Sequence, residues 1–429
     1  MKYVFFFFSL ITTTVAWSQA RKLDEVVGKA LLQNLQIQLA KNELAISNNN
    51  NYLGATGALP TVSLNASDIQ NSISINQQLN NGNTIKRDAA PANNLNVGLQ
   101  ASVIVYNGKR VYAQRERLEE LEKLSEEQLR FQIQEVVANT SSRYYDIVRL
   151  QYFLRALRQT ILFSEQQVQI IESRKEVGLA NQADLLQAQI DLNQRKQELQ
   201  TQELLLQQTK VDLLNLLQED PTNAFVPADT LFEHKNTYSI QQLIGGISNN
   251  PQLATANKLV QVNEWLVKEA TSQKYPILRF NTGYNYNRNQ SAAGLFLLNQ
   301  NFGPFAGLAL QVPIYNGSQA KRQEKSAQLA ATSSKIQEQN TRQLLEASIV
   351  KVYQAYQNAV QQITTEQQNF EMTKSLNELV LQRFSLGQAT ILEVRAAQQS
   401  FENAAFRLIN LNHAAKLADI EMKRLTGQL

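Results

Sequence analysis

Two runs of the sequence, residues 109–177 and 318–386, are equal in length and contain neither glycine nor proline. In both runs apolar residues recur every three or four positions, as Leu129, Ile133 and Val136 do, and this spacing predicts α-helix. A helix of this length extends about 100 Å at 1.5 Å per residue. A compact domain of this size is narrower, so these helices are expected to build something elongated.

A glycine ends each run, at Gly178 and Gly387, as expected for a left-handed residue that closes a helix. A further stretch without glycine or proline follows each one, over residues 179–220 and 388–426, and predicts a returning helix. Each half of the chain is therefore predicted to contain a very long helical hairpin.

The chain is internally repeated. At an offset of 209, the letters YNG at residues 106–108 fall on YNG at 315–317. At the same offset, RKEVGLANQADLLQAQ from Arg174 falls on RFSLGQATILEVRAAQ from Arg383. Nearer the start of each half the offset is 216, and the matched pairs there are Asn34 with Asn250 and Pro60 with Pro276. A duplicated half is the organisation that these matches predict.

Before each YNG the apolar period changes from helical to two, which predicts strands of about ten residues. A fourth alternating segment, from Val62 to Ile75, slips in phase near Asp68, where a bulge is expected. The strands are predicted to pair as two hairpins with polar tips near residues 77–93 and 288–301. One strand face is apolar and the other is rich in Asn, Gln and Ser. This favours a transmembrane barrel with a wet lumen over a half-buried sheet on a soluble core.

Each YNG joins a predicted strand to a predicted long helix. Asn107 and Asn316 are expected to be the N-caps of these helices, since asparagine is a favoured capping residue. Gly108 and Gly317 are expected to ease the corner. This feature is predicted to be structural rather than chemical.

The first residues have the pattern of a secretory signal: a basic start, an apolar core, and the small-x-small site Ala16-Trp17-Ser18. Export from the cytoplasm is expected. The absence of cysteine excludes disulfides, thiol catalysis and Cys-ligated metals. Past the signal no apolar run is long enough for a transmembrane helix, so a membrane-embedded form would have to be a β-barrel.

Composition argues against other function classes. Charged residues make up only 18%, and the net charge of +4 comes with no basic-aromatic cluster, so no nucleic-acid partner is predicted. The only histidines are His234 and His413, and no catalytic set, phosphate loop or metal-spaced cluster occurs. An enzyme is not predicted, nor is any cofactor or bound metal.

Four strands cannot close a barrel, and each unpaired backbone group left in lipid costs several kcal/mol. Other copies of the chain are therefore expected to complete it, most economically by cyclic symmetry. Coaxial long helices would then form a second, helical barrel. The alternative is a periplasmic or surface coiled-coil structural protein with no pore, which the alternating strands disfavour because a coiled coil has no need of them.

The doubled layout, the YNG corners preceded by VIV and VPI, and the paired turns VGLANQADLLQAQ and LGQATILEVRAAQ resemble the TolC-like outer-membrane efflux proteins (outer membrane factors). The resemblance covers essentially the whole mature chain. It implies a mixed α and β membrane protein that forms a homotrimer. Four strands per subunit would build a 12-stranded transmembrane β-barrel, continued by a long α-helical periplasmic barrel, in the outer membrane of a Gram-negative bacterium.

The same resemblance implies an exit duct of a tripartite efflux or type I secretion system. Its partners would be a periplasmic adaptor (membrane fusion) protein, an inner-membrane RND-type or ABC-type pump, and outer-membrane lipid. The pump chooses the substrate, so drugs, metals and proteins all remain open as cargo.

By resemblance, the glycine turns lie at a closable periplasmic tip whose entrance is lined by Asp184 and Glu393. A trimer would then carry rings of three carboxylates, which favour cations. The alternative is an ordinary first-turn acid facing the helix dipole. The family's further tip residues, an acid, a tyrosine and an arginine, are replaced here by Ala396, Phe384 and Ala389. The tip is therefore predicted to be held by other contacts, or more loosely.

The predicted organisation is a signal peptide (1–18), an N-terminal helix (19–59), a β-hairpin (60–106), a helical hairpin with its tip near 178–184 (107–220), a linker (221–240), a helix (241–275), a second β-hairpin (276–315) and a second helical hairpin with its tip near 387–393 (316–429).

Overall fold

The computed structural model describes residues 20–229, 238–294 and 296–429. The predicted signal peptide, His234 and the middle of the predicted linker lie outside these ranges. The described chain divides into two compact units. The helical unit consists of the described parts of Met1–Ala40, Leu129–Pro251 and Arg342–Leu429, and the sheet unit of Lys41–Gln128 and Gln252–Thr341.

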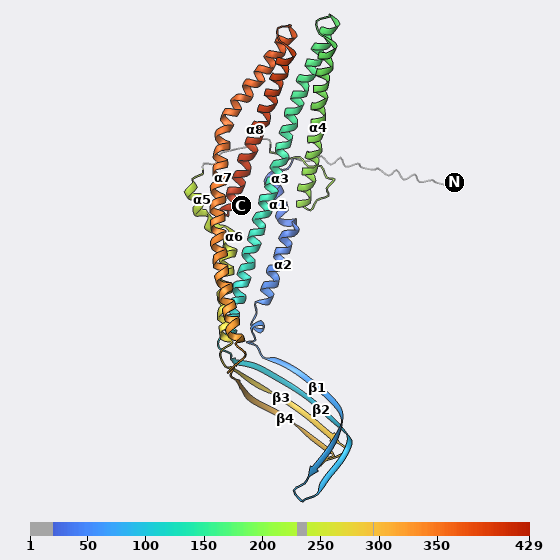
Figure 1. The fold of residues 1–429 in the computed structure, drawn as a ribbon, viewed down its shortest axis with the longest axis vertical. Coiled ribbons are helices and arrows are strands. Elements are labelled where there is room, and N and C mark those ends of the chain that lie inside the picture. Colours follow the sequence, from blue (N-terminus) through green and yellow to red (C-terminus); the bar gives the residue numbers. More distant parts are fainter. Residues whose placement is uncertain (1–19, 230–237, 295) are drawn as a thin grey trace, which may run out of the picture. The chain divides into compact units, whose positions relative to one another are not determined.

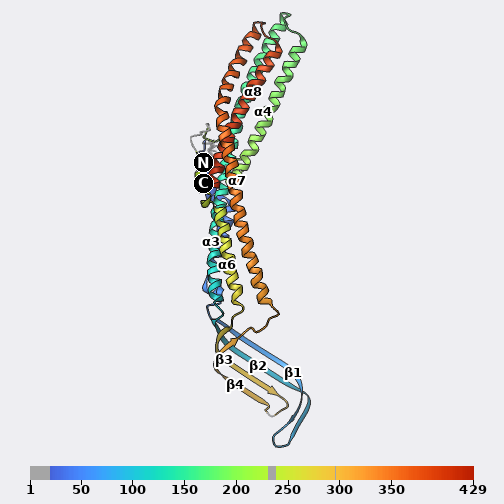
Figure 2. The ribbon, with the colours of Figure 1, turned by 60° about the vertical axis from the view of Figure 1, so that its left-hand side comes forward.

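The glycine-free runs are helices, and their bounds repeat at the offset of 209. Helices α3 and α7 each have 67 residues, and α4 and α8 each have 35. Figure 2 shows that the α3–α4 turn and the α7–α8 turn lie at the same end of the helical unit. In the described ranges no helix has an apolar stretch fit to cross a bilayer. The bounds are α3 Arg110–Glu176, α4 Gln182–Leu216, α7 Gln319–Ser385 and α8 Ile391–Leu425.

The single helices predicted over 19–59 and 241–275 are each interrupted. The breaks fall at Asn34 and Asn250, whose backbones are extended. The side-chain amide of Asn34 donates to the Leu216 carbonyl (3.1 Å), and the side-chain amide of Asn250 donates to the Leu425 carbonyl (3.0 Å). Each asparagine therefore satisfies a carbonyl at the C-terminus of a returning helix. The elements formed are α1 Leu23–Gln33, α2 Leu35–Asn50, the 3₁₀ turn η1 Leu53–Thr56, α5 Ile240–Gly246, the 3₁₀ turn η2 Ile247–Asn249 and α6 Pro251–Ser272.

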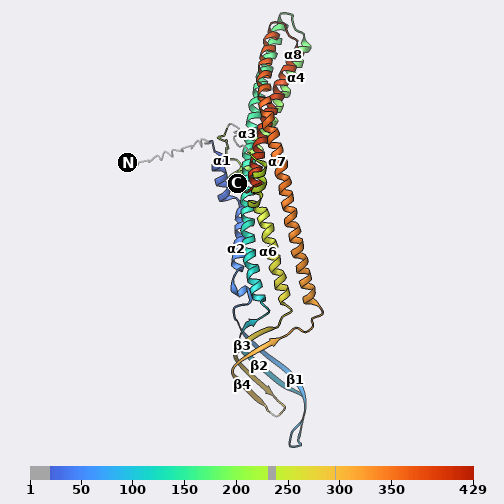
Figure 3. The same cartoon turned by 90° about the vertical axis from the view of Figure 1, so that its left-hand side faces the viewer.

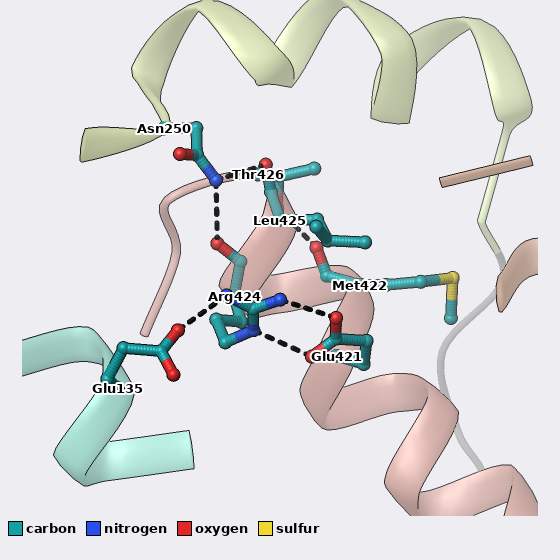
Figure 4. Close-up of polar contacts among 7 residues, drawn as sticks. All are labelled: Glu135, Asn250, Glu421, Met422, Arg424, Leu425 and Thr426. Atoms are coloured by element: carbon teal, nitrogen blue, oxygen red, sulfur yellow. Dashed lines mark hydrogen bonds and ion pairs between the residues drawn. The ribbon is translucent and has the colours of Figure 1, made fainter. Parts of the chain in front are cut away.

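Figure 4 shows the polar cluster at the second of these helix ends. Asn250 donates to the carbonyls of Arg424 (3.3 Å) and Leu425. The Arg424 guanidinium donates to both carboxylate oxygens of Glu421 (2.7 and 2.6 Å) and to Glu135 of α3 (2.5 Å). These bonds hold the pKa of Arg424 above its ordinary value, and the hydrogen bond to Glu421 is the largest cause. The cluster ties the end of α8 to α3 and to the α5–α6 segment.

The main apolar core of the helical unit surrounds Tyr144 of α3, which is fully buried. Its hydroxyl donates to the Arg21 carbonyl (3.0 Å) and accepts from the Asp229 amide (3.1 Å). Burial is the largest cause that raises the pKa of this phenol. The chain ends of the first repeat are thereby anchored on its long helix.

The sheet unit contains one antiparallel sheet in the order β1-β2-β3-β4 (Figure 1). The strands are longer and the hairpin tips shorter than predicted, because ladder pairing continues through polar positions such as Ser72↔Pro91. The register stays regular at Asp68, where a bulge was predicted, and shifts instead between Ile73 and Ile75. The strands are β1 Thr61–Gln78, β2 Thr84–Tyr106, β3 Ile277–Ser291 and β4 Leu298–Gln311.

Above the sheet, ion pairs connect the helix segments of the same unit, which Figure 3 shows side by side. Between α3 and α6 these are Arg117–Glu269 (2.8 Å) and Lys258–Glu120 (3.0 Å). A further pair, Lys335–Glu264 (2.8 Å), links α7 to α6. The side-chain amides of Asn48 in α2 and of Asn51, just after α2, donate to the carboxylate of Glu122 in α3.

Candidate functional site

The sheet has two chemically different faces. Residues directly opposite in an antiparallel ladder place their side chains on the same side, so the register assigns each row to a face. The rows of one face run across the strands as Ala66–Val97–Tyr286–Phe302, Leu64–Leu99–Tyr284–Pro304, Val62–Ala101–Thr282–Ala306, Val103–Phe280–Leu308 and Tyr106–Leu278–Leu310. Thr282 is the only residue of these rows that is neither aliphatic, aromatic nor proline.

The intervening rows are polar or small, as the alternation predicted. They are Asn65–Gly98–Asn285–Gly303, Ser63–Gln100–Gly283–Phe305, Thr61–Ser102–Asn281–Gly307 and Ile104–Arg279–Ala309. Phe305 and Ile104 are the exceptions on this face. The Phe305 ring packs where a Cβ on Gly283 would lie 2.9 Å from it. The sheet therefore has one face suited to an apolar medium and one suited to water.

Within residues 20–229, 238–294 and 296–429, much of the apolar face is left exposed. Leu64 is 70% exposed, and Phe302 and Leu308 are each 68% exposed. The band from Phe302 to Leu310 extends about 27 Å along β4 at ~3.4 Å per residue. Residues 302–310 are thus close in number to the about 9–11 residues with which a tilted strand crosses a bilayer. In the described chain β1 and β4 each pair on one side only.

Each strand-to-helix corner is a tight turn in which two successive residues have positive φ. At the first corner these are Gly108 (67°) and Lys109 (66°), and the Arg110 amide donates to the Asn107 carbonyl (3.2 Å). Positive φ at both central residues with this bond is the pattern of a type I′ turn. The second corner repeats it with Gly317 (66°), Ser318 (62°) and the bond from Gln319 to Asn316.

The asparagines are therefore the first residues of turns, three positions before each helix, rather than the predicted N-caps next to the helices. The Asn107 side chain still accepts from the Val111 amide (3.2 Å), which satisfies one free donor of the first turn of α3. The two glycines also differ. A Cβ on Gly108 would lie 2.5 Å from the Tyr275 Cβ, whereas one on Gly317 would meet nothing within 4 Å.

At the other end of the long helices, both glycine turns have the same C-cap geometry. Gly178 has φ 79° and its amide donates to Lys175, while Leu179 donates to the Arg174 carbonyl (2.7 Å). Gly387 has φ 78° and repeats both bonds one repeat later. This pair of bonds is the Schellman motif, which requires a left-handed residue at the glycine.

Asp184 and Glu393 are the third residues of α4 and α8. Glu393 forms a capping box: its carboxylate accepts from the Thr390 amide (2.6 Å), and its own amide donates to the Thr390 hydroxyl (3.3 Å). The hydrogen bond from the Thr390 backbone amide is the largest cause that lowers the pKa of Glu393. At Asp184 only the backbone takes part, donating to the Asn181 side chain (2.8 Å). Both acids lie in the first turn of their helices, where the alternative interpretation placed them, and Glu393 in addition caps its helix.

Below these turns an apolar cluster joins the two hairpins within one chain. It contains Phe163, Val168, Ile171, Leu185, Ala188, Val380, Leu381, Phe384, Val394, Ala397 and Phe401, with Ala389 packed against it. Phe384 is buried, and the Arg174 guanidinium lies 5.1 Å from its ring centroid and donates to its carbonyl (3.1 Å). Ala396 is exposed.

Two ion pairs between α4 and α8 were not predicted from sequence. Asp191, which is buried, pairs with Arg395 (2.9 Å). Arg195 pairs with Glu402 (3.5 Å), where burial is the first cause that raises the pKa of the carboxyl. The signal available was charge on an otherwise apolar helix face, but the partners are about 200 residues apart in sequence and only packing brings them together.

In the described residues no group of three His, Asp or Glu side chains is arranged to hold a metal. His413 of α8 lies beside Asp146 of α3, with 3.0 Å between Nε2 and the carboxylate. This is an interhelical contact inside the helical unit.

Comparisons with known proteins agree with this architecture. The family model described as outer membrane efflux protein matches residues 26–218 and 246–428. Outer membrane protein TolC of Vibrio cholerae is 24% identical over 310 residues, which is 69% of this chain and 68% of the relative.

Among solved structures, the outer membrane protein VceC of Vibrio cholerae superposes with a TM-score of 0.79 at 18% identity, covering 94% of this chain and 96% of that one. The CmeC outer membrane channel of Campylobacter jejuni gives 0.80 at 18% identity, with 95% and 85% covered. These likenesses establish the fold, and the family match extends over most of the sequence. The chain belongs to the outer membrane efflux protein family.

Proposed function

We propose that three copies of this chain form a 12-stranded transmembrane β-barrel, continued by an α-helical barrel in the periplasm. The observation that carries the proposal is the two-faced sheet with single-sided edges at β1 and β4. An unpaired edge in lipid would leave several backbone groups without partners, each at a cost of several kcal/mol. Pairing β4 of one subunit with β1 of the next satisfies both edges, and cyclic repetition closes the wall.

In this assembly the apolar rows face lipid and the rows containing Asn65, Gln100 and Asn285 face the lumen. Residues 60–106 and 276–315 form the membrane part, and the helical hairpins form the periplasmic tunnel. The lumen is then a water-filled path, so the protein conducts passively and has no catalytic role.

The proposed cellular role is the exit duct of a tripartite efflux or type I secretion system, with a periplasmic adaptor and an RND-type or ABC-type pump. Family membership and the outer-membrane channels among the structural neighbours support this role. The glycine turns would form the periplasmic tip, with Asp184 and Glu393 at its entrance. Inside each subunit, Arg174–Phe384 and Asp191–Arg395 are among the contacts available to hold that tip.

The test compares two lysine substitutions on neighbouring residues of β4. Leu308→Lys places a charge on the apolar face, and Ala309→Lys places it on the polar face beside Arg279. A lysine facing lipid near mid-membrane costs about 2–4 kcal/mol per subunit. We expect wild type and Ala309→Lys to yield heat-sensitive trimers that conduct in planar bilayers, and Leu308→Lys to yield few.

A soluble wild-type monomer would contradict the duct and leave the non-pore coiled coil as the explanation. Equal tolerance of both substitutions would contradict the assignment of the lipid face.

A further inference from the structure

A pocket lies at the first strand-to-helix corner of the sheet unit, between the start of α3 and the end of α6. Its walls include the aromatic side chains of Tyr106, Tyr112, Trp265 and Tyr275. The Tyr112 and Trp265 rings meet edge to face, with 5.7 Å between centroids. Four aromatic rings in one surface pocket form a rigid apolar wall with polar rims.

Two lysines, Lys109 and Lys268, lie in the same pocket. The Lys268 ammonium is 3.4 Å from the Trp265 ring centroid. No carboxylate of residues 20–229, 238–294 and 296–429 forms an ion pair with either lysine, whereas nearby Arg117 and Lys274 are neutralised by Glu269 and Glu324. The pocket therefore carries two uncompensated positive charges.

The pocket adjoins the apolar face of the sheet. A register shift between Ile104 and Tyr106 places Tyr106 opposite Leu278, which is itself opposite Leu310. Without that shift Tyr106 would belong to the polar rows, because side chains alternate along a strand. The bulge thus turns one wall of the cationic pocket onto the same side as the exposed apolar band.

We propose that this pocket binds the headgroup of an anionic glycerophospholipid from the periplasm-facing leaflet of the outer membrane. The inference rests on the proposed barrel, which puts the apolar band in lipid. Lys109 and Lys268 bind the phosphate, the aromatic rings contact the glycerol and the first methylenes, and the acyl chains lie along Leu278 and Leu310. Basic pockets at membrane surfaces select anionic headgroups, and tyrosine and tryptophan favour this depth. A free anion would leave the aromatic wall and the apolar band unused.

The experiment measures lipid binding to the purified, delipidated full-length protein in detergent by native mass spectrometry. The probes are phosphatidylglycerol, zwitterionic phosphatidylethanolamine and soluble glycerol 3-phosphate. We expect Lys109→Gln/Lys268→Gln to bind phosphatidylglycerol at least about tenfold more weakly, since each basic residue contributes appreciably to anionic-lipid attraction. The matched control Lys351→Gln/Lys374→Gln removes two exposed lysines of α7 in the helical unit and should bind as wild type does.

A second measurement uses only wild type. The preference for phosphatidylglycerol over phosphatidylethanolamine should shrink when salt is raised from about 0.1 to 1 M, because screening weakens ionic contacts. Unchanged affinity in the pocket variant, or no headgroup preference in wild type, overturns the proposal. Glycerol 3-phosphate binding as tightly as the lipid would identify a free-anion site and also overturn it. Trimer formation and conductance are measured on the same samples, so a failure of the proposed duct is seen separately.

Discussion

The guanidinium of Arg174 in α3 lies against the ring of Phe384 in α7 and donates to its carbonyl oxygen at 3.1 Å. The two residues belong to different repeats, and the contact sits just below both glycine turns. It is therefore a direct link between the two hairpin tips within one subunit. Phe384 is the position where the resemblance implied a tyrosine latch, and here its ring is buried in the apolar cluster instead.

Replacing Arg174 with glutamine should loosen this link. A cation–π contact and a charge-assisted hydrogen bond of a partly exposed arginine together contribute about 1–2 kcal/mol. Hydrogen exchange of amides around Gly387 should then become about tenfold faster, and the closed-state current of the channel should rise. The control Lys175→Gln removes the same charge from the next residue, whose side chain donates to Gln182 of the same hairpin. Equal effects of both substitutions would count against a specific link.

The Glu393 capping box should make the start of α8 sensitive to acid. The Thr390 backbone amide, followed by its hydroxyl, holds the pKa of Glu393 below its usual value. A depressed folded-state pKa means that the carboxylate stabilises the native cap above the ordinary glutamate pKa and loses this contribution as the pH falls through the lowered value.

Exchange protection of residues 391–394, corrected for intrinsic rates, should therefore decline as the pH falls below the ordinary glutamate pKa of about 4.3 and through the lowered pKa of Glu393. Glu393→Gln can still cap but does not titrate, so it should abolish that decline. Asp184→Asn should leave the decline at α8 in place, because the first-repeat cap uses the Asn181 side chain. An identical pH profile in Glu393→Gln would rule out the capping box as its source.

Ion selectivity tests the proposed entrance. If Asp184 and Glu393 line a trimeric opening, Asp184→Asn/Glu393→Gln removes two rings of three carboxylates. The open channel should then lose cation preference, seen as a reversal potential closer to zero under a salt gradient. Glu172→Gln/Glu378→Gln removes two other exposed carboxylates near the same turns and serves as the matched control. A shift in the control as large as in the double variant would mean that general surface charge, not the entrance, sets selectivity.

Local rules in the sequence predicted much of this fold. The runs without glycine and proline predicted residues 109–177 and 318–386 as helices, and α3 and α7 end within one residue of those limits. Alternation predicted both sheet faces as far as Val103, because side-chain direction alternates with position in a regular strand. It did not predict the register shift that turns Tyr106 onto the apolar face. The break at Asn34 was missed because its cause is a hydrogen bond to a carbonyl 182 residues away. The Arg174–Phe384 and Asp191–Arg395 contacts were missed for the same reason, since packing selects the partner.

The two strand-to-helix corners have the same backbone and should nevertheless differ in their tolerance of substitution. Alanine at either Gly108 or Gly317 must adopt a positive φ, at a cost of about 1–2 kcal/mol. At Gly108 the new Cβ would also lie 2.5 Å from the Tyr275 Cβ and 2.9 Å from the Ser272 carbonyl oxygen. Overpacking of this kind adds about 1–3 kcal/mol.

Gly108→Ala should therefore lower the temperature or urea concentration at which the trimer dissociates more than Gly317→Ala does, and valine at each site should enlarge both effects. Trimer yield and dissociation midpoints on gels measure this. Reversal potentials of the surviving channels should match wild type, since neither substitution changes a charge. Equal losses of stability at both corners would show that backbone conformation alone determines the cost of substitution. Altered selectivity with normal trimer yield would show that the corners do more than join strand to helix.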